Sequence, residues 1–289
     1  MKGRAQGIAN RGGGMLLRRL ITALVLIPVV LLGVLELTTP SLAVALCAVV
    51  LLAAREWTTL AGLEGVAWRV AFYLVLTLGL IGGYGALWHP SLALWMLGLA
   101  SLWWLLLTLL MARIRTRPDL RLPLGRLGKS LLGVFILVTC WAALVALHGS
   151  GDNGPVLLLF ALTLTWVADS GAYFAGRRWG RRKLAPAISP GKSIEGVYGA
   201  LAGAALWGAL LAWYAPEIAS APVLILFCLI VCAVSVVGDL FESLLKRQAG
   251  IKDSGNLLPG HGGVLDRIDS LTAVAPVFAF GLMLLERLQ

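Results

Sequence analysis

The sequence predicts an all-α polytopic membrane protein of about nine transmembrane helices, with a polar site at its cytoplasmic side. Of its 289 residues, 59% are hydrophobic and only 13% are charged, against about 25% charged in a typical soluble domain. The mean hydropathy is +0.89. The apolar stretches are each about 20 residues long, which is the length that a helix needs to cross a hydrocarbon core of about 30 Å.

Nine apolar spans follow one another, separated by short Pro- or Gly-containing breaks or by longer basic connectors. The basic, glycine-rich residues 1–14 are expected to be disordered. Residues 15–289 are expected to form one integral-membrane domain, whose second half, about 155–289, carries the polar motifs. The spans are predicted at 16–36, 41–60, 69–88, 91–112, 130–148, 155–176, 196–215, 221–242 and 270–287.

The basic residues predict the orientation of these spans. All but one of the 24 lysines and arginines fall at the N-terminus or in connectors on one side of the nine-span arrangement, and only Arg287 falls on the other. The positive-inside rule therefore predicts a cytoplasmic N-terminus and cytoplasmic polar connectors. The net charge of +10 is therefore explained by basic residues that gather on the cytoplasmic side of the membrane. It does not indicate nucleic-acid binding, because the sequence offers no soluble domain that would carry such a surface.

The connector after the sixth span offers groups suited to phosphate. Asp169 lies within an apolar run, where it is expected to face a polar cavity or a helix-packing partner rather than lipid. Ser189, Lys192 and Ser193 form a turn expected to open the seventh helix. A P-loop is rejected because Pro186 replaces its first glycine and no β-strand is expected before it. Two interpretations remain: a phosphate-binding turn, or a helix cap with a membrane-surface lysine.

Carboxylates and cations recur where the eighth span ends and the ninth begins. One face of the eighth helix carries Asp239, Glu242, Ser243 and Lys246 at helical spacing. Asp266 and Asp269 form a second pair at the start of the ninth helix. We expect Asp239, Asp266 and Asp269 to converge on one cation, and oxygen ligands favour Mg²⁺ over zinc. For any single pair of these charged residues, the alternative explanation is a helix face that is exposed to solvent beside the membrane.

Clustered cations beside these carboxylates suggest phosphoryl or nucleotidyl transfer at a cytoplasmic membrane face. The cations are Lys246, Arg247, Lys252 and Arg267, which are expected to hold phosphate charge. His261 lies nearby in a turn whose glycines allow positive φ and close ligand approach. For His261 two interpretations stay open, a contact with a phosphate or base and a purely local hydrogen bond.

The polar run from Ser243 to Asp269 resembles the defining motif of phosphatidate cytidylyltransferases (CDP-diacylglycerol synthases). The matching positions are Ser243, Leu245, Lys246, Arg247, Lys252, Asp253, Gly255, Leu258, Pro259, His261, Gly262, Gly263, Val264, Asp266, Arg267, Ile268 and Asp269. The segment from Trp166 to Gly196 and the apolar start near residue 20 are also similar to that family. Residues about 40–155 match only in being hydrophobic, so the resemblance says little about them.

The resemblance implies a nucleotidyltransferase that converts CTP and phosphatidate into CDP-diacylglycerol and pyrophosphate with Mg²⁺. It also implies a homodimer in the bacterial inner membrane; a second, monovalent cation at the site is left open. The implied catalytic residues are Asp239, Asp266, Lys246 and Arg247, and the implied metal ligands are Asp239, Asp266 and Asp269. The implied substrate-binding residues are Ser189, Lys192, Ser193, Asp169, Lys252, Asp253, His261 and Arg267.

Two other functions compete with this interpretation. A CTP-using lipid kinase would transfer the γ-phosphoryl group and release CDP, but the complete run from His261 to Asp269 argues against it. A transporter of a phosphorylated solute would use intramembrane Asp169 as its coupling group. Many transporters contain paired repeats, and the sequence shows no convincing repeat.

Overall fold

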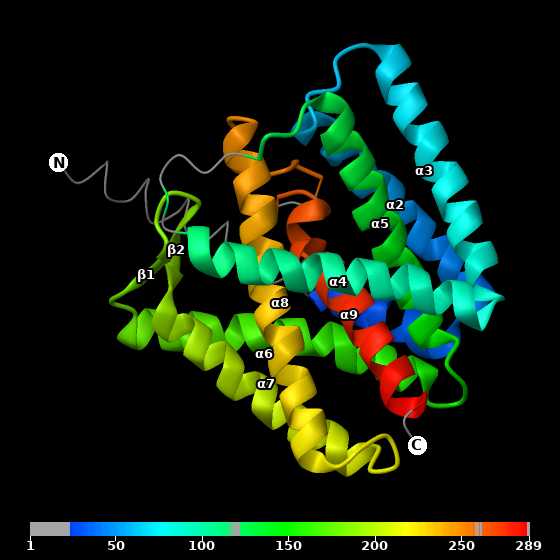
Figure 1. The fold of residues 1–289 in the computed structure, drawn as a ribbon, viewed down its shortest axis with the longest axis vertical. Coiled ribbons are helices and arrows are strands. Elements are labelled where there is room, and N and C mark those ends of the chain that lie inside the picture. The colour runs from blue at the N-terminus through cyan, green and yellow to red at the C-terminus, as the bar shows by residue number, and fades with distance from the viewer. Residues whose placement is uncertain (1–23, 116, 118–121, 258–259, 261, 288–289) are drawn as a thin grey trace.

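The computed structural model describes residues 24–287 except 116, 118–121, 258–259 and 261, and it confirms an assembly of long apolar helices (Figure 1). Within these residues, eight helices are long and apolar enough to cross a membrane. They are α2 (Thr39–Leu60), α3 (Val66–Leu87), α4 (Pro90–Ile114), α5 (Arg126–His148), α6 (Gly154–Trp179), α7 (Ile194–Tyr214), α8 (Ala221–Gln248) and α9 (Leu265–Arg287). A shorter apolar helix, Leu24–Glu36, lies in the first predicted span; the rest of that span and the basic segment 1–14 lie outside the described residues.

Several helices begin at residues that suit a helix N-terminus. Thr38 precedes α2 and accepts a hydrogen bond from the Ser41 backbone N–H at 3.4 Å. Pro155 and Pro222 lie in the first turns of α6 and α8, where a missing N–H costs no intrahelical hydrogen bond. These signals explain why the observed starts fall close to the ends of the polar breaks in the sequence.

The last two helices extend further than the apolar pattern predicted. α8 continues from the predicted end at residue 242 to Gln248, and α9 begins at Leu265 rather than at residue 270. Hydropathy declines at the first charged side chains, whereas backbone hydrogen bonding continues through them. The consequence is that Lys246, Asp266 and Asp269 all lie on helices, which fixes the directions of their side chains.

A small hairpin corrects the expectation that no β-strand precedes the Gly-Lys-Ser sequence. Strand β1 (Lys183–Ala185) pairs antiparallel with β2 (Ser189–Ser193), with Lys183 opposite Ser193 and Ala185 opposite Ser189. The pairing was missed because the strands are short and the segment is rich in Pro and Gly. The P-loop remains excluded by Pro186, and the Gly-Lys-Ser sequence lies within β2 itself.

Close packing of α6 against α7 holds this hairpin beside the helices (Figure 1). A β-carbon at Gly171 would collide with the Gly199 carbonyl oxygen, and one at Gly199 would collide with the Gly171 carbonyl. Glycine at both positions therefore permits the backbones to approach, as is common for helices packed within membranes. α7 starts directly at the end of β2, so this contact fixes the position of the hairpin.

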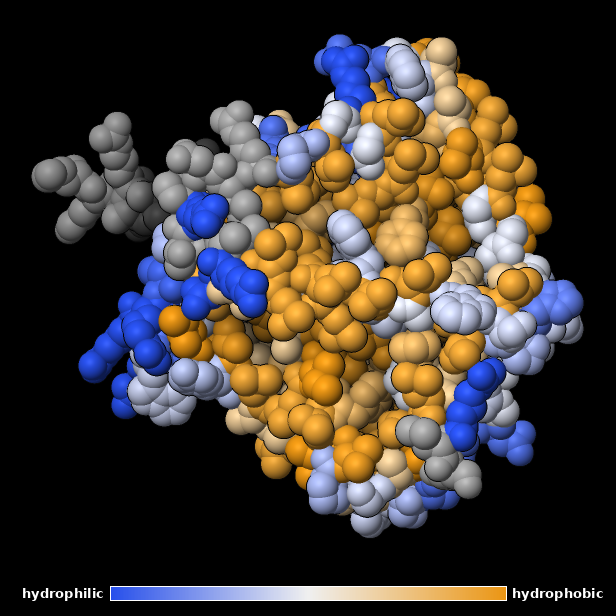
Figure 2. Space-filling view, in the orientation of Figure 1, coloured by the Kyte–Doolittle hydropathy of each residue, from blue (hydrophilic) through white to orange (hydrophobic). Residues whose placement is uncertain are grey.

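The core lies between α4, α5, α8 and α9. Trp104, Phe241 and Phe278 are among the largest fully buried side chains, and the rings of Trp104 and Phe241 meet edge to face at 5.8 Å. In contrast, α3 exposes large apolar side chains such as Leu74, Leu78 and Ile81. Figure 2 shows a broad apolar surface with polar residues gathered at its margins, as expected for a multi-pass membrane protein.

The connectors predicted to share one side of the membrane do meet at one end of the helices. Trp57 Nε1 near the end of α2 donates to the Lys129 carbonyl at the start of α5, at 2.9 Å. Arg247 Nε at the end of α8 donates to the Ile188 carbonyl in the hairpin turn, at 3.3 Å. We call this end of the helices the motif end, and it includes the hairpin and the described residues between α8 and α9. At the opposite end, His148 Nδ1 lies 2.9 Å from Thr39 Oγ1.

Candidate active site

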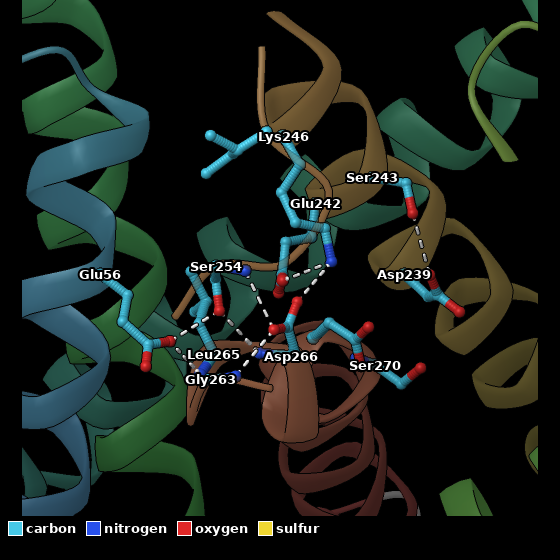
Figure 3. Close-up of polar contacts among 12 residues, drawn as sticks. Glu56, Asp239, Glu242, Ser243, Lys246, Ser254, Gly263, Leu265, Asp266 and Ser270 are labelled. Carbon is cyan, nitrogen blue, oxygen red and sulfur yellow. Dashed lines mark hydrogen bonds and ion pairs between the residues drawn. The ribbon is translucent and has the colours of Figure 1, made fainter. Parts of the chain in front are cut away.

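A buried ion-pair cluster joins α8 to α9 at the motif end (Figure 3). Lys246 Nζ lies 2.6 Å from Asp266 Oδ1 and 3.1 Å from Glu242 Oε1. Lys246 is 8% exposed and Glu242 is 3% exposed. Because isolated charges at such depth are very unfavourable, these three side chains stabilise one another by pairing. We call this group the Lys246 cluster.

Asp266 also organises the segment that precedes α9. Its second oxygen, Oδ2, accepts hydrogen bonds from the backbone N–H groups of Ser254 at 2.9 Å and of Gly263 at 2.8 Å. The Asp266 N–H in turn donates to Ser254 Oγ at 3.3 Å. Both carboxylate oxygens of Asp266 are therefore engaged, one with Lys246 and the other with the backbone on both sides of the turn.

Glu56 is a member of this network that the sequence interpretation missed. It lies near the end of α2 and is 7% exposed. Its carboxylate accepts from Ser254 Oγ at 2.7 Å, from the Val264 N–H at 2.9 Å and from the Leu265 N–H at 2.8 Å. The signal that could have identified it is the one used for Asp169, a carboxylate inside an otherwise apolar span.

A second polar group lies where the hairpin meets α6, α7 and α8. Lys192 Nζ in β2 lies 2.6 Å from Asp239 Oδ2 in α8, and Ser243 Oγ donates to Asp239 Oδ1 at 3.3 Å. Lys192 and Asp239 border a cavity of about 380 Å³, which we call the Lys192 cavity. Its polar lining comprises Asp169, Tyr173, Arg177, Lys192, Ser193, Ser235, Asp239 and Ser270.

The hairpin is held in place at its base by Glu195. The Glu195 carboxylate accepts from the Arg181 and Arg182 backbone N–H groups at 3.0 and 3.1 Å, and from Arg182 Nε at 3.0 Å. The hydrogen bond that the Arg182 side chain donates to Glu195 raises the pKa of the Arg182 guanidinium above its ordinary value. Ser193 Oγ accepts from the Gly196 N–H at 3.1 Å and so caps α7. Lys192 thus projects from a fixed backbone.

The remaining predicted site residues occupy several environments. Arg247 donates to the carbonyl groups of Ile188 and Ile251, and Asp269 Oδ1 accepts from the Ser270 N–H at 2.7 Å. Lys252, Asp253 and Arg267 are exposed near the motif end, and Ser189 is half-buried in β2. His261 lies outside the described residues.

The predicted three-aspartate metal site is not assembled in this arrangement. Among the described residues, no group of three or more His, Cys, Asp or Glu side chains is placed to hold a metal ion. Asp266 is engaged by Lys246 and two N–H groups, so it does not fit a ligand role here. Asp239 and Asp169 offer carboxylate oxygens to the Lys192 cavity, and that donor chemistry fits Mg²⁺ completed by water and phosphate oxygens.

Sequence comparisons supply the identity that this geometry suggests. A sequence model of the Cytidylyltransferase family matches residues 17–285. The chain is 46% identical over 269 residues to the phosphatidate cytidylyltransferase of Pseudomonas aeruginosa, covering 92% of this chain and 96% of that protein. The chain belongs to the phosphatidate cytidylyltransferase family. It is therefore an enzyme, a nucleotidyltransferase, and family membership implies metal-assisted nucleotidyl transfer.

Other relatives show how far the likeness extends. The phosphatidate cytidylyltransferase of Haemophilus influenzae is 38% identical over 287 residues, with 92% of this chain and 98% of that protein covered. The enzyme of that name from Thermotoga maritima is 44% identical over 140 residues, with 47% of this chain and 52% of that protein covered. Membership of the phosphatidate cytidylyltransferase family favours nucleotidyl transfer over the kinase and transporter functions.

Proposed function

We propose that this phosphatidate cytidylyltransferase transfers the cytidylyl group of CTP to phosphatidate at the motif end, giving CDP-diacylglycerol and pyrophosphate. The observation that carries the proposal is the Lys192 cavity, where a cation on a fixed strand faces Asp239 within helices that span the membrane. Such a cavity offers charge neutralisation to phosphates and apolar walls to a lipid. The relatives named phosphatidate cytidylyltransferase support these two substrates.

The reaction requires positioning and charge neutralisation more than a protein nucleophile. An oxygen of the phosphatidate phosphate attacks the α-phosphorus of CTP, and a new P–O bond forms. The bond from the α-phosphorus to the bridging oxygen breaks, and that oxygen leaves with pyrophosphate. Aligning two anionic substrates in line is a task for fixed cations and hydrogen-bond donors.

Lys192 and Asp239 are the residues that we assign most directly to substrate. Lys192 would hold phosphate oxygens, with Ser189 and Ser193 on the same strand beside it. Asp239 would hold Mg²⁺ with Asp169 on the same cavity; when bound, the ion supplies further neutralisation of triphosphate charge. A phosphate that enters the cavity would displace Asp239 from Lys192. Lys192 would then pair with the phosphate, and Asp239 would pair with Mg²⁺.

Lys246 and Asp266 contribute in a different way. Their mutual contact of 2.6 Å and the Asp266 hydrogen bonds to Ser254 and Gly263 support a role in holding the start of α9. Asp269 as a metal ligand, and Arg247, Lys252, Asp253, His261 and Arg267 as phosphate or nucleotide contacts, remain predictions. We also propose that the motif end is cytoplasmic in a bacterial inner membrane and that the enzyme acts as a homodimer.

Product analysis with purified protein tests the proposal. Pyrophosphate release is measured in detergent with phosphatidate and Mg²⁺, comparing CTP with ATP, GTP and UTP. We expect release with CTP alone, matched by a CDP-lipid product. Release of CDP in place of pyrophosphate would indicate a kinase, and the absence of turnover with all four nucleotides, from folded protein, would contradict the proposal.

A further inference from the structure

Glu56 is a buried carboxylate whose partners all belong to the segment that enters α9. Figure 3 shows its side chain pointing from α2 toward Ser254 and Leu265. It accepts hydrogen bonds from Ser254 Oγ and from the backbone N–H groups of Val264 and Leu265, between 2.7 and 2.9 Å. None of the ion pairs among the described residues includes Glu56.

A buried carboxylate without a cation is unfavourable unless hydrogen-bond donors replace its hydration. The start of α9 supplies such donors, because the first N–H groups of a helix have no intrahelical acceptor and the helix dipole favours negative charge there. Glu56 therefore acts as a helix cap supplied by another helix, 209 residues earlier in the sequence than Leu265. This contact also occupies the N-terminus of α9, which is then not free to bind a phosphate.

Ser254 extends the contact from Glu56 to the Lys246 cluster. Its hydroxyl donates to Glu56 and accepts from the Asp266 N–H, while its own N–H donates to Asp266 Oδ2. A β-carbon at Gly263 would collide with Glu56 Oε2 and with Ser254 Oγ, so this position requires glycine. The hydrogen bonds thus run without interruption from α2 to Asp266 and, through Asp266, to Lys246.

We propose that Glu56 is a positioning residue for cytidylyl transfer, which holds Ser254 and the first turn of α9 in the geometry that the active site requires. The inference rests on the proposed function, because it assumes that Asp266 and its neighbours serve that reaction. Glu56 touches neither substrate, and it acts through Ser254 and the start of α9. The N-terminal half of the chain thereby becomes part of the active site.

The test compares Glu56→Gln with Glu64→Gln. Glu64 follows α2 at the same end, but its side chain is 84% exposed, and its one ion pair within the described part of the chain is with Arg126, at 3.6 Å. We expect kcat for CDP-lipid formation to fall about 10- to 100-fold in Glu56→Gln, as is usual when a partner that orients an active-site group is lost. Glu64→Gln should keep wild-type kcat within about twofold, because an exposed ion pair contributes little.

Hydrogen exchange separates positioning from a general loss of stability. In Glu56→Gln, we expect faster amide exchange confined to the 251–266 region, with unchanged exchange in α5 and α7. Faster exchange throughout the protein would contradict a positioning role, and so would a wild-type kcat in folded Glu56→Gln. Failure of the proposed function is recognised separately, because the wild-type enzyme would then form no CDP-lipid while the local exchange result would still stand.

Ser254→Ala provides a second route to the same conclusion if Glu56→Gln does not fold. It removes one hydroxyl from the same network, and we expect a severalfold loss of kcat with exchange changes in the same region. Where both variants fold, the double variant should lose less than the product of the two single losses, because the substitutions break one shared contact. Fully multiplicative losses would overturn the proposed connection.

Discussion

Asp239 and Asp266 carry the same functional group in two different environments. Asp239 has a side chain that is 28% exposed beside the Lys192 cavity, whereas Asp266 is 7% exposed and buried against Lys246. The same substitution should therefore separate a substrate contact from a structural contact. Asparagine preserves the shape of the side chain and removes its charge, so it is the appropriate replacement at both positions.

Asp239→Asn should reduce turnover by on the order of 100-fold, the scale expected when one preorganised electrostatic group is removed from an active site. The unfolding temperature should change little, since a partly exposed ion pair contributes about 1 kcal/mol or less. Pyrophosphate release and thermal denaturation in detergent measure the two effects. The control is Asp152→Asn, because Asp152 is an exposed residue at the opposite end. Turnover within twofold of wild type in Asp239→Asn would contradict the assignment of Asp239 to the active site.

Asp266→Asn should lower both turnover and stability. Among the described residues, the substitution leaves buried Lys246 with Glu242 as its only remaining ion-pair partner, and breaking a buried ion pair costs about 3–5 kcal/mol. We expect a loss of about 3 kcal/mol, the low end of this range, because Glu242 retains part of the pairing. Chemical denaturation of the purified variant measures this loss, with Asp239→Asn as the matched comparison. Equal stability of the two variants would contradict a stabilising role of the buried pair between Lys246 and Asp266.

Between elements, the contact of α6 with α7 has the greatest consequence for the site. The backbones meet at Gly171 and Gly199, and α7 begins where the hairpin strand β2 ends. Separating the two helices would therefore displace Lys192 from Asp239, although neither residue takes part in the contact between the glycines. Function at the motif end depends on small residues within the membrane-spanning part of the chain.

Gly199→Ala should destabilise the protein by about 1–3 kcal/mol, the usual cost of inserting a carbon into a packed interface, and should also lower turnover. Gly82→Ala is the matched control, because a β-carbon at Gly82 on α3 would meet no atom of another described element within 4 Å. Thermal denaturation and CDP-lipid formation are measured for both variants. If Gly199→Ala behaves like Gly82→Ala, the helices adjust freely and the contact does not set the geometry of the site.

For the whole molecule, the antiparallel order of the helices places the hairpin, the described residues between α8 and α9, and the Lys192 cavity at one end. The basic connectors predict that this end is cytoplasmic. Cysteine introduced at exposed Asn256 should therefore react with a membrane-impermeant maleimide only in inverted vesicles, and cysteine at Asp152 only in intact cells. The control is the unaltered protein, because its cysteines all lie within α2, α5 and α8. The reverse labelling pattern would contradict a cytoplasmic motif end.

Much of the fold could be predicted from sequence because a bilayer imposes a length and a polarity on each crossing segment. The eight described spans lie close to their predicted positions, and the breaks between them fall at Pro, Gly and polar residues. Boundaries were less accurate at α8 and α9, where polar residues continue a helix past the apolar region. The hairpin was missed because a strand of three to five residues leaves almost no periodic signal.

At the candidate site, the sequence alone determined which residue types gather at one end of the membrane spans and which family motif they form. Spacing along one helix fixes which side chains share a face, so the polar face of α8 could be predicted. Only the tertiary structure decided which partners meet: Lys192 with Asp239, Lys246 with Asp266, and Glu56 with the start of α9. Those choices depend on how separate helices pack together, and residues that are distant in the sequence carry no local pattern that records their contact.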